Sequence, residues 1–231
     1  MNEFKNIWIL IKSGFLPKEK RNLRDTIFLG LKLYLILILL KALCFGISYF
    51  LDYYGVFEMP MHITGEKIRS YSPILKILMI AIIAPIIEEF TYRIGLLFSK
   101  RNLTITIIGI SYFTLKNLSE LDRLYCILIA LGIGVALYLS LNQKFVDLFS
   151  KFWKMNRRKI FYGLLLIFSL PHLANYEITT ELLIFSPIVI LPHLVAGFIY
   201  SYARLNSGII LAICIHSFNN GIIPLISLIT E

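Results

Sequence analysis

The sequence predicts an all-α protein, a polytopic bundle of about seven transmembrane helices. Hydrophobic residues make up 58% of the chain and the mean hydropathy is +0.76, more apolar than ordinary globular domains. Apolar runs recur from residue 27 to the end and leave no stretch in which a separate water-soluble core could form. None of these runs alternates as an outer-membrane β-barrel strand does, so helices, which satisfy their own backbone in lipid, are expected throughout.

The N-terminal segment, 1–26, is expected to be amphipathic, interfacial and cytoplasmic. It has no small-residue cleavage site, and its short apolar patch is followed by mixed charge, so we do not expect a secretory signal peptide. The rest of the chain, 27–231, is expected to form one transmembrane domain.

The candidate spans are apolar segments close to the roughly 20 residues that cross the hydrocarbon core. They are 27–51, 73–98, 102–115, 124–141, 159–175, 186–203 and 207–228. If the N-terminus is cytoplasmic, the connectors on the cytoplasmic side hold most of the lysines and arginines outside the spans, as the positive-inside rule requires. The sequence therefore predicts a multi-pass protein with its N-terminus in the cytoplasm.

Neither the charge nor the cysteines indicate another class of protein. The net charge is +9, but the basic residues fall at the ends of hydrophobic segments and form no aromatic-interleaved groove or Gly-rich phosphate loop. Orientation in the membrane explains the excess, and nucleic acid is not expected as a partner. Cys44, Cys126 and Cys214 are widely separated, which indicates core packing rather than a disulfide or a zinc ribbon.

Charged residues occur at membrane depth in the stretch PIIEEFTYR, 85–93. A lone charge at the bilayer centre costs roughly 2.5–3.5 kcal/mol. Glu89 and Arg93 are four residues apart with the acid first, which favours an ion pair on one helix face. Glu88 lies about 100° around the helix and is expected to face the bundle interior as a candidate general base. The alternative is that both glutamates pair with Arg93 and with Lys76 or histidines, and only lock the helices together.

Two further polar clusters lie in other predicted spans. Phe168 and His172 are four apart in IFSLPHLANY, so they share a helix face. The same spacing separates His216 and Asn220 in ICIHSFNNGI. Polar groups in lipid need partners, and we expect these side chains to meet Glu88 in one internal pocket. Such a pocket suits hydrolysis, because a carboxylate can take a proton from water while imidazole and amide groups stabilise an oxyanion.

The type of hydrolysis stays open on this evidence. Serine chemistry is disfavoured because no G-x-S-x-G motif occurs. Zinc is a candidate cofactor, since two histidines and a glutamate match catalytic zinc ligands, although H-E-x-x-H is absent and asparagine is a poor ligand. The candidate metal ligands are Glu88, His172 and His216. The alternative is a glutamate mechanism that uses no metal.

Together the three clusters resemble the motifs of the CPBP family, which comprises CAAX prenyl proteases and bacteriocin-processing or Abi proteins. The family pattern E-E-x-x-x-R, F-x-x-x-H and H-x-x-x-N reads here, in the same order, as Glu88, Glu89 and Arg93, then Phe168 and His172, then His216 and Asn220. The flanking sequences AP and YARLNSGII are also similar. The resemblance implies an intramembrane endopeptidase of the bacterial cytoplasmic membrane, whose partners are the lipid bilayer and a peptide or protein substrate.

The resemblance also implies roles for single residues. Glu88 and His172 would activate the attacking water, and His216 with Asn220 would hold the tetrahedral oxyanion. The supporting residues would be Glu89, Arg93 and Phe168. Members of this family are described both as metalloproteases and as glutamate-dependent enzymes, so the resemblance leaves both mechanisms open.

Four other residues need an interpretation. Phe113 and Asn117, in FTLKN, repeat the second motif with asparagine in place of histidine. We expect His172 rather than Asn117 to hold the second-motif position, because its distance from the third motif fits better. His193 is expected to pack, and Lys41, within an apolar run, is expected to snorkel or to pair.

Two functions other than proteolysis are alternatives. One is a noncatalytic membrane protein that binds a peptide, such as a bacteriocin immunity factor. The other is a proton-coupled transporter, because carboxylates and histidines within spans also serve as proton relays. The sequence predicts neither the oligomeric state nor the substrate and its cleavage site.

Overall fold

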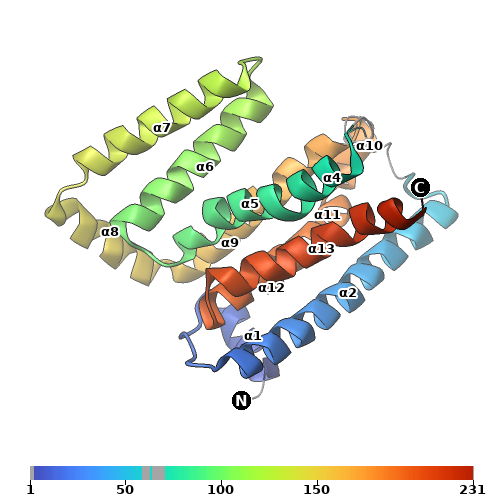
Figure 1. Ribbon diagram of the computed structural model, residues 1–231, viewed down its shortest axis with the longest axis horizontal. Coiled ribbons are helices and arrows are strands. Elements are labelled where there is room, and N and C mark those ends of the chain that lie inside the picture. Colours follow the sequence, from blue (N-terminus) through green and yellow to red (C-terminus); the bar gives the residue numbers. More distant parts are fainter. Residues whose placement is uncertain (1–2, 59–62, 64–70, 231) are drawn as a thin grey trace.

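The computed structural model describes residues 3–58, 63 and 71–230, and these residues form helices and no β-strand (Figure 1). The predicted all-α class is therefore confirmed. Cys44 and Cys126 are buried, as the predicted core packing requires, but Cys214 is exposed, so that prediction is wrong for Cys214.

The N-terminal part consists of α1, Glu3–Ser13, and the long helix α2, Leu23–Tyr53. Asn22 caps α2, because its side-chain oxygen accepts the backbone N–H of Asp25 at 2.8 Å. One seam of α2 is buried, while the rest of its surface is largely exposed and apolar. The seam consists of Leu29, Leu33, Leu37, Cys44 and Ser48.

Helix α1 lies against the start of α9, Arg157–Ser169. The hydroxyl of Tyr162 donates to the carbonyl of Ile11 at 2.9 Å. Gly14, with φ of +65°, ends this region so close to the backbone of Arg158 that an added Cβ would lie 2.6 Å from its Cα. The boundary expected at residue 26 stays a prediction.

A change of helix type precedes the two glutamates. Helix α4, Pro73–Lys76, runs into a π-helix, η1, Ile77–Ile83, which is followed by α5, Ala84–Tyr92, and the 3-10 turn η2, Ile94–Leu96. The wide turn ends beside Pro85, which has no N–H to donate to the preceding turn. The N–H of Ala84 donates to the carbonyl of Met79, five residues back, as a π-helix requires.

The next three helices are α6, Lys100–Leu118, α7, Arg123–Ser140, and α8, Gln143–Met155. Helices α6 and α7 form an antiparallel hairpin at one side of the molecule (Figure 1). Gly109 lets α6 approach α5, because a Cβ at this position would lie 2.1 Å from Oγ1 of Thr91. Helix α8 buries none of its residues, but the indole N–H of Trp153 donates to the carbonyl of Gly95 at 2.9 Å.

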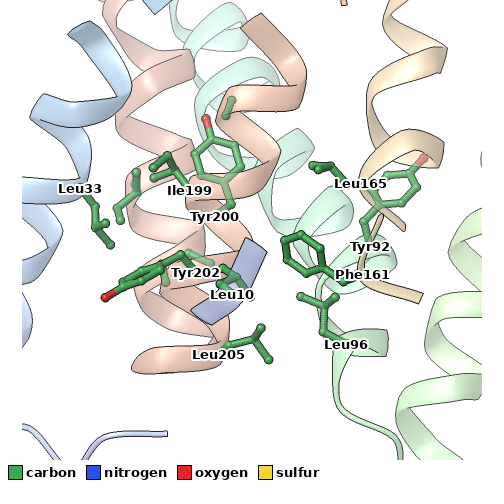
Figure 2. Packing of buried hydrophobic residues seen from close by; sticks show 14 of the residues in the cluster. Leu10, Leu33, Tyr92, Leu96, Phe161, Leu165, Ile199, Tyr200, Tyr202 and Leu205 are labelled. Carbon is green, nitrogen blue, oxygen red and sulfur yellow. The ribbon is translucent and has the colours of Figure 1, made fainter. Parts of the chain in front are cut away.

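The C-terminal half supplies the centre of the core. It contains α9, the 3-10 helix η3, Leu170–Asn175, then α10, Thr180–Ile184, α11, Ser186–Val189, α12, Leu191–Asn206, and α13, Ile209–Thr230. Helix α12 contacts α2, α9 and α13, and Figure 2 shows its Ile199 and Tyr200 between Leu33 of α2 and Leu165 of α9. Burial on several sides makes α12 the helix best placed to fix groups inside the bundle.

Two helices of the described residues, α2 and α7, are long and apolar enough to cross a membrane by length and composition. A shorter apolar stretch is Ile209–Ile222 in α13. Every predicted span falls mainly on helix, but 73–98 is divided among four elements, 159–175 between α9 and η3, and 186–203 between α11 and α12. The predicted number of spans is therefore not confirmed, because prolines and changes of helix type cut the apolar segments into shorter pieces.

Candidate active site

Glu88 and Glu89, on α5, both approach His216 on α13. Oε1 of Glu89 lies 2.9 Å from Nδ1 of His216, and Oε2 of Glu88 lies 3.7 Å from Nε2. Because a carboxylate only accepts, Nδ1 carries the proton and donates it to Glu89. Nε2 then faces Glu88, as an acceptor when the ring is neutral and as a donor in the imidazolium.

The two glutamates differ in access. Glu89 is fully buried, whereas 18% of the Glu88 side chain is exposed. Consecutive side chains on a helix point about 100° apart, so the adjacent carboxylates reach opposite nitrogens of one ring from different directions. Glu88 is therefore the glutamate of the pair with exposed side-chain surface, although its Oε2, which faces His216, is buried.

Arg93 follows α5 as its C-cap and pairs with Glu89, with Nε 3.6 Å from Oε2. This contact confirms the predicted i,i+4 ion pair. The guanidinium carbon also lies 3.7 Å from the centroid of the Phe168 ring and 5.6 Å from that of Tyr200. The Tyr92 ring lies 5.9 Å away, so a residue that is only 1% exposed has one carboxylate and three aromatic rings around its guanidinium.

His172 lies on η3, which continues α9 past Phe168. Its Nδ1 is 3.0 Å from the carbonyl oxygen of Phe168, so Nδ1 carries the proton and Nε2 carries the lone pair. The ring meets that of Phe168 edge-on at 5.1 Å. The Phe168 ring also meets the His216 ring edge-on at 6.1 Å, so both histidines contact Phe168 and belong to one cluster.

Asn220 lies one turn beyond His216 on α13 and reaches toward η1. Its Nδ2 is 3.5 Å from the carbonyl oxygen of Ile80, and its Oδ1 accepts Nδ2 of Asn219 at 2.8 Å. The carbonyl of Ile80 is available because the residue five places later, Pro85, has no N–H to donate to it. The change of helix type before the glutamates thus prepares an acceptor for Asn220.

The structure brings His172, and not Asn117, to the cluster. Asn117 is exposed near the end of α6. Phe113, its companion in the repeated spacing, does lie near the site, because its ring stacks on Tyr92 at 5.8 Å. Tyr92 in turn meets Phe168 edge-on at 5.5 Å.

Two residues of α12 line this cluster: His193, which the sequence predicts as a packing residue, and Tyr200, which sequence reasoning missed. The ring of His193 stacks on His172 at 3.8 Å, and the ring of Tyr200 stacks on His216 at 4.3 Å. Gly197 lies between them, where an added Cβ would be 3.0 Å from Nη2 of Arg93. The three positions follow the i, i+4, i+7 spacing of one helix face, and this periodicity is the signal that could have found them.

The donors proposed for zinc do not gather as a metal site. Among the described residues, no group of three or more His, Cys, Asp or Glu side chains could hold a metal ion. Nδ1 of His216 is bonded to Glu89, and Nδ1 of His172 to the carbonyl of Phe168. These bonds leave Nε2 of both rings free, as in metal-binding histidines, so the misfit with a zinc centre of three protein ligands rests on the placement of the side chains in the described residues.

A family model described as type II CAAX prenyl endopeptidase Rce1-like matches residues 70–222. The matched segment contains Glu88, Glu89, Arg93, Phe168, His172, His216 and Asn220. No curated protein and no solved structure matches the chain.

Proposed function

Since this chain belongs to the Rce1-like family of type II CAAX prenyl endopeptidases, we propose that it hydrolyses a peptide bond of a membrane-proximal peptide or protein. Membership in the family implies a protease, and the apolar helices indicate a membrane protein. The observation that carries the mechanism is the contact of His216 with both Glu88 and Glu89.

In the proposed reaction Glu88 is the general base. It is the partly exposed carboxylate, and it takes a proton from water while the water oxygen bonds to the carbonyl carbon of the substrate. The carbon–nitrogen bond then breaks, and the proton passes to the leaving amine. His172 contributes its unprotonated Nε2 to holding the water, because its Nδ1–H is fixed on the carbonyl of Phe168.

The oxyanion formed by this attack needs hydrogen-bond donors. We assign this role to Nε2–H of His216 as an imidazolium and to Nδ2 of Asn220. Glu89 supports the role, because its bond to Nδ1 fixes the orientation of the ring. Arg93 and Phe168 hold Glu89 in place from the other side.

We propose that the chain passes the bacterial cytoplasmic membrane several times with its N-terminus inside. Two basic connectors meet at one end of the bundle, which supports this orientation. Gly14 touches the backbone of Arg158, and the guanidinium of Arg157 lies 3.9 Å from the centroid of the Phe15 ring. Basic connectors that lie together belong on the same, cytoplasmic side.

The test compares the purified protein with Glu88→Gln and with a control, Glu120→Gln, on a quenched-fluorescence peptide library in proteoliposomes. Glu120 is exposed and lies between α6 and α7, away from the cluster. We expect Glu88→Gln to lower kcat roughly 100- to 10,000-fold, the usual contribution of a general base. Equal cleavage by wild type and Glu88→Gln would remove Glu88 from the mechanism.

A noncatalytic peptide-binding protein, such as a bacteriocin immunity factor, is the second candidate. It is favoured by the mutual compensation of Glu89, Arg93 and His216, which a purely structural cluster would also show. The distinguishing assay measures the protection of cells from a peptide toxin. Protection that survives both Glu88→Gln and His172→Ala would support this candidate and exclude hydrolysis as its cause.

A further inference from the structure

Lys41 carries an amine well inside α2, a helix that is otherwise almost entirely apolar at this depth. Its Nζ does not extend along the helix toward an end, as a snorkelling lysine would. It donates to Oδ1 of Asn219 on α13 at 3.1 Å. An amine kept in such a segment has a cost, so its partner is informative.

The cation sets the direction of a chain of hydrogen bonds. A lysine ammonium only donates, so Asn219 must turn its oxygen toward Lys41 and its amide nitrogen away. Nδ2 of Asn219 then donates to Oδ1 of Asn220 at 2.8 Å. Because its oxygen is occupied, Asn220 must present its own N–H groups on the opposite side.

The last hydrogen bond of this series, that of Asn220, also has a defined direction. Nδ2 of Asn220 lies 3.5 Å from the carbonyl oxygen of Ile80, which lacks a helical donor because Pro85 has no N–H. A carboxamide is often free to rotate by 180°, which exchanges its donor and acceptor ends. Here a donor-only cation at one end and an acceptor carbonyl at the other permit a single orientation.

We propose that Lys41 is a positioning residue, which acts through Asn219 to keep the N–H groups of Asn220 directed into the active site. This inference rests on the proposed oxyanion role of Asn220. Lys41 lies outside the segment that the family model matches, so the relay joins the first long helix to the catalytic segment. A competing explanation is a simple tie between α2 and α13.

The experiment uses Lys41→Met, which keeps the length of the side chain and removes its charge, and Asn219→Leu, which interrupts the relay in the middle. The matched control is Lys32→Met, since Lys32 is exposed on the same helix. We expect both relay variants to lose roughly 10-fold or more in kcat with little change in KM, because the oxyanion donor is misaligned. Lys32→Met should leave kcat unchanged.

Coupling to Asn220 and the melting temperature separate positioning from a simple tie. Asn220→Ala alone should cost about 100-fold in kcat, and Lys41→Met/Asn220→Ala should cost no more than that. The Tm of Lys41→Met should equal or exceed that of the wild type, since methionine removes the cost of placing a charge in an apolar segment. Losses that multiply, or an unchanged kcat in Lys41→Met, would overturn the proposal.

A readout independent of activity keeps this inference distinguishable from the proposed function. The side-chain amide resonances of Asn220 are identified by their disappearance in Asn220→Ala and followed in ¹⁵N-labelled protein. Lys41→Met should shift or broaden them, whereas Lys32→Met should not. If the wild type cleaves no peptide but the resonances respond, the proposed hydrolysis fails and the relay stands. If the resonances do not respond, the relay fails.

Discussion

His193 lies face to face with His172, with ring centroids 3.8 Å apart and planes inclined by 27°. His172 is held by the carbonyl of Phe168 at its Nδ1 and by the ring of His193 on one face. Helix α12 therefore fixes the plane of an imidazole that η3, a short 3-10 helix with Pro171 in its first turn, could not fix alone.

Replacing His193 tests whether this stacking or a second proton carrier matters. His193→Phe keeps an aromatic face and should retain kcat within about 3-fold, whereas His193→Ala should lower kcat by about 10-fold, since ring pairs contribute about 0.5–1.5 kcal/mol. The measurement is kcat on the cleaved peptide for both variants. A loss in His193→Phe as large as that in His193→Ala would instead give the His193 imidazole a role in proton transfer.

Glu89 should be needed for stability as well as for activity. Glu89→Gln leaves the buried guanidinium of Arg93 without its carboxylate, and breaking one side of a buried pair costs roughly 3–5 kcal/mol. We expect a lower Tm in detergent and partial recovery in Glu89→Gln/Arg93→Met, which removes both charges. A double variant less stable than the single one would show that Arg93 is compensated mainly by Phe168 and Tyr200.

We expect substitution by alanine to have opposite effects on stability at Gly109 and at Gly132. A Cβ at Gly109 would lie 2.1 Å from Oγ1 of Thr91, so Gly109→Ala should push α6 from α5 and cost roughly 1–3 kcal/mol. A Cβ at Gly132 in α7 meets nothing within 4 Å, so Gly132→Ala should stabilise the helix by roughly 0.5–1 kcal/mol. Thermal unfolding of the two variants side by side checks both signs.

Chelators should not abolish peptide cleavage. No group of three potential ligands is placed to hold a metal ion among the described residues, and the proposed reaction uses Glu88 as its base without a metal. The check is activity before and after treatment with 1,10-phenanthroline, together with the zinc content of the purified protein. Inactivation that stoichiometric zinc reverses would assign Glu88, His172 and His216 to a metal centre after all.

The spacing of residues along the sequence was enough to predict which side chains share one face of a helix. The contact of Glu89 with Arg93 follows from four residues of separation, and so it could be predicted. The bond of Glu89 to His216 could not, because the rotation of α5 relative to α13 depends on the packing of all the helices around them. We expected Glu88 to be the partner of the histidines, and His216 in fact reaches both carboxylates.

The missed residues have the same physical origin. Tyr200 was missed and His193 was predicted only to pack, because stacking on a site histidine depends on the position of a second helix. The π-helix η1 had one local signal, Pro85, but a proline in an apolar run predicts a kink at least as readily as a widened turn. Helix existence could therefore be predicted, while helix type and helix rotation could not.

The seven residues of η1, Ile77–Ile83, determine how α5 is rotated about the helix axis. They thereby set the direction of the two glutamates relative to the carbonyl of Ile80, which meets Asn220. Each residue turns a helix by about 100°, so removing one would swing Glu88 and Glu89 away from His216 or Ile80 away from Asn220. Exchanges among isoleucine, leucine and methionine leave that rotation intact. Apolar substitutions within η1 should therefore be tolerated, whereas the deletion of a single residue should not.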